Sequence, residues 1–212
     1  MDVANPYSII RQANAPIAVK SVKTYRRDIR SIVRGLWSNV IGFDQAFESF
    51  QSTITRHFTQ AWHAGAKECS ISPDELSQSE LDSLREQIIE ETQFISGFLE
   101  AIEANSKPNG GKIAPLFGRV ELWVNKWDAV FELAQSMACA DQKAVWILGR
   151  TEKHCVSCSG FNGRVYRFST WHANDALPRS SRLACNGFRC DCRLEQTDRP
   201  LNKGRFPASL LQ

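Results

Sequence analysis

The feature that most constrains this chain is a cluster of cysteines near its C-terminal end. Five of the seven cysteines lie between positions 155 and 192: a C-x-x-C pair, Cys155 and Cys158, and then a C-x4-C-x-C group, Cys185, Cys190 and Cys192. The C-x-x-C spacing is typical of the first half of a zinc site, because two intervening residues let both thiolates reach one ion at about 2.3 Å. The second group supplies further sulfurs, so the sequence predicts a metal site.

Tetrahedral zinc takes four ligands, and this stretch offers more than four. The spacing leaves open which four of the five cysteines, or His154 beside them, bind the ion. Since thiolates from the chain would fill every position, we expect the zinc to be structural rather than catalytic. The surrounding patch is too small to hold a core of its own, so the metal would supply much of its folding free energy.

Disulfides and redox chemistry are the alternatives for these cysteines. Disulfides require an oxidising compartment, and residues 1–6 lack the basic and apolar segments that open a signal peptide. Seven cysteines is also an odd number. A thioredoxin-like pair would open a helix, whereas residues 159–163, Ser-Gly-Phe-Asn-Gly, have the composition of a turn. Both alternatives stay open, and the pattern favours metal.

Most of the chain before the cysteines has helical periodicity. Apolar residues at three- and four-residue spacing predict helices from Ser21 to about residue 41, over 43–69, over 72–104 and over 115–141. The third begins at Ser72-Pro73-Asp74-Glu75, which has the pattern of a capping box. The wide apolar face of the fourth predicts burial on more than one side, with Cys139 packed there.

The cysteine region itself predicts short β-structure. Asn162-Gly163 is a tight-turn dipeptide, and residues 164–168 alternate as a strand does. We therefore expect a mainly α fold: a bundle of about four helices followed by a small cysteine-rich, zinc-ribbon-like β-hairpin module. The expected domains are a flexible N-terminal arm (1–20), a helical domain (21–149), a cysteine-rich metal-binding module (150–195) and a C-terminal tail (196–212).

Charge is distributed unevenly along the chain although its net value is only +3. Residues 43–106 carry twelve acidic and three basic side chains, and basic residues exceed acidic ones on either side of this segment. Basic ends favour anionic partners, or they complement the acidic middle within or between molecules. No apolar run approaches the roughly 18 residues of a membrane helix, so we expect no membrane partner.

The cysteine pattern also resembles a known family. Residues 151–158 (Thr-Glu-Lys-His-Cys-Val-Ser-Cys), 161–166 (Phe-Asn-Gly-Arg-Val-Tyr) and 183–192 (Leu-Ala-Cys-Asn-Gly-Phe-Arg-Cys-Asp-Cys) are similar to the phage Mu F-like head morphogenesis, or minor head protein, family. Asn162 stands where the family usually has Asp, and Cys185 with a longer gap stands where it has His-Pro. The resemblance covers residues 115–195.

The resemblance implies a non-enzymatic role in building a virion. Such a protein is an assembly factor at or near the portal vertex, present in several copies per particle, with portal and capsid proteins as partners. Its basic ends would contact packaged double-stranded DNA. It would be found in the virion head, and in the host cytoplasm during assembly.

A nucleic-acid-binding zinc ribbon is the alternative function. Arginines would contact phosphates or a partner, and Tyr166, Phe168 and Trp171 would stack on bases. The contact arginines expected from the sequence are Arg164, Arg167, Arg189 and Arg193, with Arg179 and Arg182 as further phosphate contacts. An enzyme is not expected, because the sequence shows no nucleophile–base pair, histidine–carboxylate cluster or phosphate loop, and we assign no catalytic residue.

Overall fold

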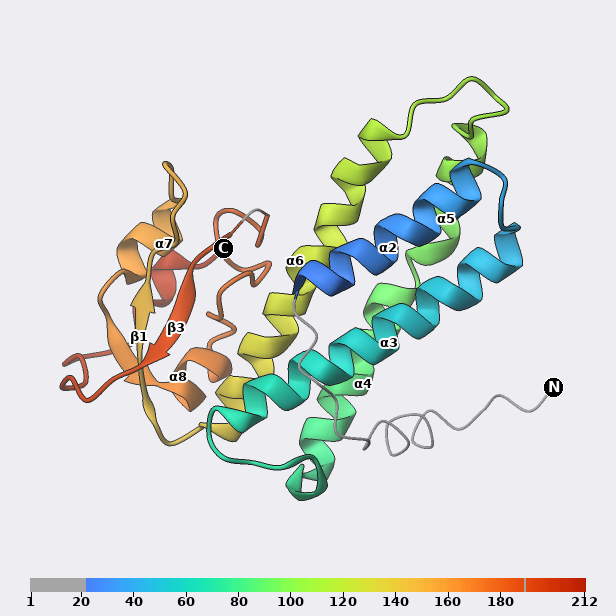
Figure 1. Cartoon of the computed structure of the whole chain (residues 1–212). Helices are drawn as coiled ribbons and strands as arrows, with labels where there is room; N and C mark the ends of the chain where they lie inside the picture. The colour runs from blue at the N-terminus through green and yellow to red at the C-terminus, as the bar shows by residue number, and fades with distance from the viewer. Residues whose placement is uncertain (1–21, 189) are drawn as a thin grey trace. The chain divides into compact units, whose positions relative to one another are not determined.

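The computed structural model describes residues 22–188 and 190–212 and is mainly helical, with a small antiparallel sheet and a cysteine cluster, as expected (Figure 1). The expected N-terminal arm, residues 1–20, and Arg189 lie outside the described residues. The helices are α2 (Val22–Trp37), α3 (Phe43–Lys67), α4 (Gln78–Thr92), α5 (Ile95–Ala104), α6 (Ala114–Ala138), α7 (Val156–Phe161) and α8 (Phe168–Ala173), with 3-10 turns η1 (Pro73–Glu75) and η2 (Ala208–Leu210). The strands are β1 (Lys143–Ile147), β2 (Val165–Arg167) and β3 (Arg193–Gln196).

The chain forms two compact units whose boundaries fall inside helices. The first, the helical unit, ends at Ala61 and resumes over Leu76–Trp127; the second, the cysteine unit, contains Trp62–Glu75 and Asp128–Gln212. These boundaries differ from the expected ones at 149/150 and 195/196. The expected boundaries followed the change in composition, whereas α3 and α6 each run on from one unit into the other.

The helical unit is built on the apolar stripes that the sequence predicts. Tyr25, Ile29 and Val33 of α2 recur every four residues and are fully buried. Phe50 of α3 packs edge-on against Trp123 of α6, with ring centroids 5.1 Å apart. The phenylalanines of α3 therefore belong to a core, as helical spacing usually indicates.

The segment expected as one helix over 72–104 is instead divided in two. The capping box forms at Ser77 and Glu80, where α4 begins, whereas Ser72 hydrogen-bonds to Glu75 ahead of the short turn η1. A break then separates α4 from α5, and Phe94 at the break is 57% exposed. The sequence from 81 to 102 contains no proline to mark that break.

The basic helix α2 finds acidic partners within the helical unit. Arg26 and Arg30 both form ion pairs with Glu121 of α6, at 3.0 and 2.7 Å. Arg56 of α3 pairs with Asp28 at 3.1 Å. Part of the positive charge near the N-terminal end is therefore complemented within this unit, which was one of the two expectations from the charge distribution.

The cysteine unit contains a three-stranded antiparallel sheet in the order β2-β1-β3. Val145 of the central strand faces Val165 on β2 and Glu195 on β3. Residues 164–168 were expected as a strand, and β2 confirms their core. The small β module is therefore present as expected, but its central strand β1 was not expected, because the sequence shows only a short apolar run there.

The last residues pack into the cysteine unit instead of forming a tail. The ring of Phe206 lies 5.6 Å from that of Phe161 and 5.4 Å from that of Trp171. The carbonyl of Leu210 accepts a hydrogen bond from the buried hydroxyl of Ser157. The expected tail over 196–212 is therefore wrong, because Phe206, Leu210 and Leu211 pack against the core that contains Trp146.

A disulfide joins Cys69 and Cys139, the two cysteines outside the late cluster. It links the chain just beyond the ends of α3 and α6 within the cysteine unit, across a sequence separation of 70. Cys139 is buried, as expected, but its bond to Cys69 was not foreseen. Among the described residues, no helix is both long and apolar enough to cross a membrane.

Removing this disulfide should lower stability without changing the fold. In the double variant Cys69→Ser/Cys139→Ser, the free energy of unfolding is expected to fall by about 3–4 kcal/mol, because the bond closes a long loop in the unfolded chain. Urea unfolding followed by tryptophan fluorescence measures the difference. Equal midpoints for the oxidised wild type and the variant would contradict the disulfide.

Candidate metal centre

The five late cysteines gather at one place in the cysteine unit. Cys155, Cys158 and Cys185 form one trio whose sulfurs all lie within 4.8 Å of one another, and Cys158, Cys190 and Cys192 form a second. Cys158 belongs to both trios, and its sulfur lies 3.9 Å from that of Cys190. These thiols lie close enough to hold a metal ion, and we refer to them together as the thiol cluster.

The C-x-x-C pair stands at the start of a short helix. Cys155 is the N-cap residue of α7, and its sulfur accepts a hydrogen bond from the backbone N–H of Cys158 at 3.4 Å. The turn expected directly after Cys158 is therefore wrong, because residues 159–161 continue α7. The pair does open a helix, contrary to the prediction from the sequence. The three further sulfurs beside the pair still distinguish it from an isolated redox pair.

Cys185 is brought to the pair by a buried serine. The hydroxyl of Ser157, between the two cysteines of the pair, accepts a hydrogen bond from the backbone N–H of Ala184 at 2.9 Å. The same hydroxyl donates to Leu210, and Ser157 is fully buried. One side chain thus joins α7, the loop before Cys185 and the C-terminal segment. Sequence reasoning missed Ser157, because a lone serine in a C-x-x-C pair has no distinctive pattern.

The loop that carries Cys185 and Cys190 depends on the turn at Asn186-Gly187. Both residues have positive φ, 50° and 70°, which favours Asn and Gly. A Cβ on Gly187 would lie 2.1 Å from the carbonyl oxygen of Arg179, so only glycine fits this crossing. The turn predicted from the sequence is confirmed, and it also brings two loops into direct contact.

Arg179 ties this loop to helix α6. Its side chain is only 10% exposed; Nη1 donates to the carbonyl of Cys192 at 3.3 Å, and Nη2 donates to Asp128 at 3.2 Å. Glu132, one turn further along α6, accepts a hydrogen bond from the backbone N–H of Leu194 at 3.4 Å. Two side chains near the end of α6 thus fix the chain around Cys192, immediately before β3.

Contact between the thiols and their burial shift their pKa values in opposite directions. Hydrogen bonds from the thiols of Cys158 and Cys192 hold the pKa of Cys190 far below its usual range. The same hydrogen bond with Cys190 raises the pKa of Cys158, and burial raises the pKa of Cys185 to about 11. A metal ion would displace the remaining protons, since thiolates are the form that binds metal.

Oxygen and nitrogen ligands are directed elsewhere. His154 Nδ1 lies 3.2 Å from the hydroxyl of Thr151, and neither trio includes His154. The carboxylate of Asp191 accepts a hydrogen bond from the backbone N–H of Arg150 at 3.1 Å. Within the part of the chain that the structure describes, the donor set at the cluster is therefore sulfur alone.

The arginines expected to contact phosphate or a partner have bonds within the chain. Arg164 Nε donates to the carbonyl of Gly160 at 2.8 Å, and Arg167 donates to that of Asp141. Arg193 forms an ion pair with its neighbour on β3, Glu195, at 2.6 Å. Arg189 lies outside the described residues.

The aromatic residues expected to stack on bases are in the core. Phe168 and Trp171 are fully buried, and Tyr166 is 6% exposed. The ring of Trp171 packs against those of Tyr166 and Trp146, 5.1 and 5.5 Å away. The expected stacking platform is therefore wrong, because Tyr166 on β2 and Phe168 and Trp171 on α8 all pack into the core of the cysteine unit.

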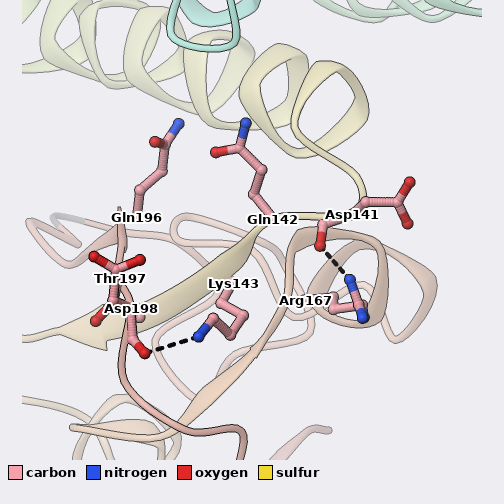
Figure 2. A pocket seen from close by; sticks show the side chains of 7 residues that line it. All are labelled: Asp141, Gln142, Lys143, Arg167, Gln196, Thr197 and Asp198. Carbon is pink, nitrogen blue, oxygen red and sulfur yellow. Dashed lines mark hydrogen bonds between the residues drawn. The ribbon is translucent and has the colours of Figure 1, made fainter.

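A polar pocket that sequence reasoning missed opens where β1 begins and β3 ends (Figure 2). Both of its cations are engaged with backbone carbonyls: Lys143 Nζ donates to Asp198 at 2.8 Å, and Arg167 donates to Asp141. It mixes both signs of charge, so its lining indicates no particular ligand. The lining residues are Asp141, Gln142, Lys143, Arg167, Gln196, Thr197 and Asp198.

Comparison with known proteins gives no relative for this chain: no family model, no curated protein and no solved structure matches it. The geometry of the cysteine unit therefore has to be interpreted from its own residues.

Two glycines provide a matched test of the loop crossing. Gly163 and Gly187 both have positive φ, but a Cβ at Gly163 would meet nothing within 4 Å. Gly187→Ala should therefore disrupt the cysteine loop and weaken metal binding at least tenfold. Gly163→Ala should leave metal affinity unchanged and lower the free energy of unfolding by only about 1 kcal/mol, because alanine disfavours positive φ. Zinc titration against a chromophoric chelator compares them, and equal affinities would refute the crossing.

Proposed function

We propose that this chain is a structural protein of a phage head, a minor head protein that acts in assembly at or near the portal vertex. We further propose that its late cysteines hold a structural zinc ion. The observation that carries the proposal is the thiol cluster: five cysteines from separate segments meet, and they are the residues on which the resemblance to the phage Mu F-like family rests.

The donor set supports zinc in a structural role. The cluster offers only sulfurs, and Cys158 and Cys192 are buried, with 2% of each exposed. Zinc bound by four thiolates has no open position for a substrate or an activated water. Four of the five cysteines would fill its coordination shell.

An ion would add to the stability that the cysteine unit already has from its aromatic core. The strands of its sheet have five, three and four residues, and the segments between them consist of short helices and loops. Crosslinks to a metal would hold together the separate segments that carry the cysteines. A rigid unit of this kind suits a protein that must hold its shape within a large assembly.

The proposed place in the particle rests on the sequence resemblance over 151–158 and 183–192. The structure adds that both segments contribute to one cluster, so their joint occurrence in the chain has a physical reason. The rival function, a nucleic-acid-binding zinc ribbon, loses support because its three stacking residues are core residues.

Zinc content tests the metal proposal. The chain expressed in zinc-containing medium should carry one zinc per molecule, and removal of zinc by a chelator should lower the melting temperature of the cysteine unit by at least 10 °C, because the crosslinks are lost. Atomic emission and calorimetry measure these quantities. The variant Cys69→Ser/Cys139→Ser is the control and should keep its zinc. A metal-free chain that is indifferent to chelator would overturn the proposal.

Co-purification with a portal ring tests the assembly proposal. The tagged chain, co-expressed with portal protein from the phage that encodes it, should elute with the portal ring. The zinc-loaded chain alone should bind free duplex DNA weakly, with a slope of log K against log salt shallower than about −3, because three of its expected phosphate contacts have bonds within the chain. Tight DNA binding with a steep salt slope and no portal association would favour the rival.

A further inference from the structure

The two trios of the thiol cluster account for every late cysteine. Cys158 stands in both, Cys155 and Cys185 complete one, and Cys190 and Cys192 complete the other. Two three-sulfur positions that share one sulfur use five sulfurs, with none left over. A single tetrahedral zinc uses four, so the fifth cysteine has no role in a one-zinc site.

Among the described residues, no histidine or carboxylate joins either trio. His154 and Asp191 are next to cluster cysteines in the sequence, but among the described residues neither belongs to a trio. Their side chains are directed to Thr151 and to the backbone of Arg150. Each position therefore presents three thiolates and no oxygen or nitrogen donor, a set that suits a soft metal ion of low coordination number.

We propose that the thiol cluster also binds two Cu(I) ions, one in each trio, with the thiolate of Cys158 bridging them. This inference rests on the proposed function only in that the cluster is a metal site; it concerns a second metal that would replace the zinc. Univalent copper is satisfied by three thiolates and is favoured by sulfur ligands over harder metals. Binding forms copper–sulfur bonds and releases the thiol protons, and no electron is transferred.

The position of Cys158 suits a bridging ligand. Its sulfur lies between the two trios, in contact with that of Cys190 at 3.9 Å, and the residue is 2% exposed. Five thiolates and two Cu(I) ions leave a net charge of three negative units at the cluster. The guanidinium of Arg179, bonded to the carbonyl of Cys192, lies beside it and offsets part of this charge, although it also pairs with Asp128 and Glu132.

Copper stoichiometry tests the proposal on the full-length, zinc-loaded chain with its disulfide intact. Cu(I) is added under nitrogen as its acetonitrile complex, against a chromophoric Cu(I) chelator, and bound copper and released zinc are measured by mass spectrometry. Two tightly bound copper ions per chain and release of the zinc are expected. A single tight copper, or more than two, would overturn the proposal.

Single substitutions test which sulfur is shared. Cys185→Ser and Cys192→Ser should each weaken one copper at least tenfold and leave the other tight. Cys158→Ser should weaken both, and the control Cys69→Ser/Cys139→Ser should still bind two. If Cys158→Ser weakens one copper only, the bridging role is refuted.

The outcomes for the two metals separate the two proposals. One bound zinc with one tight copper would refute this inference and leave the structural zinc standing. Two tightly bound copper ions in a chain that carries no stoichiometric zinc would support this inference and refute the structural zinc. The wild-type stoichiometry needs no variant, so a substituted chain that fails to fold does not prevent a decision.

Discussion

The meeting of five sulfurs around Cys158 is the constraint on which the cysteine unit depends. Local structure positions four of these sulfurs: Cys155 and Cys158 lie at the start of α7, Cys185 follows Ala184, whose N–H donates to Ser157, and Cys192 immediately precedes β3. Thiols this close cannot all ionise without strong repulsion, and the opposed pKa shifts of Cys190 and Cys158 show this competition for protons. A bound cation would relieve this repulsion, since metal–sulfur bonds would replace the protons.

Support for the cluster comes from elements that hold no cysteine ligand. Arg179 and Glu132 connect the end of α6 to the chain around Cys192, and the Cys69–Cys139 disulfide ties the ends of α3 and α6 together within the same unit. Gln196 of β3 donates toward both sulfurs of that disulfide, at 3.5 and 3.6 Å. The C-terminal parts of α3 and α6 therefore belong to the cysteine unit, and their earlier parts belong to the helical unit. This explains why compact units divide inside α3 and α6 rather than at the change in composition.

Three aromatic residues that could have bound bases at the surface of the cysteine unit lie in its core. Tyr166, Phe168 and Trp171, which the alternative function needed on the outside, instead form a core with Trp146 and Phe206. The aromatic residues thus stabilise the small sheet and are not exposed for binding bases. Burial of these three aromatic residues is unfavourable for recognition of single-stranded nucleic acid, which needs exposed rings.

Features that depend on neighbouring residues could be predicted before the structure was known. Amphipathic spacing predicted α2, α3 and α6, and hence the mainly α fold. The Asn-Gly dipeptide predicted the turn at Asn186-Gly187, and the spacing of the cysteines predicted the residues of the candidate site. Tertiary structure alone decided the pairing of Cys69 with Cys139, the central strand β1, the break between α4 and α5 and the packing of residues 196–212. It also decided that Cys158 is shared between two trios. Each of these depends on contacts between residues far apart in the chain, for which local periodicity carries no information.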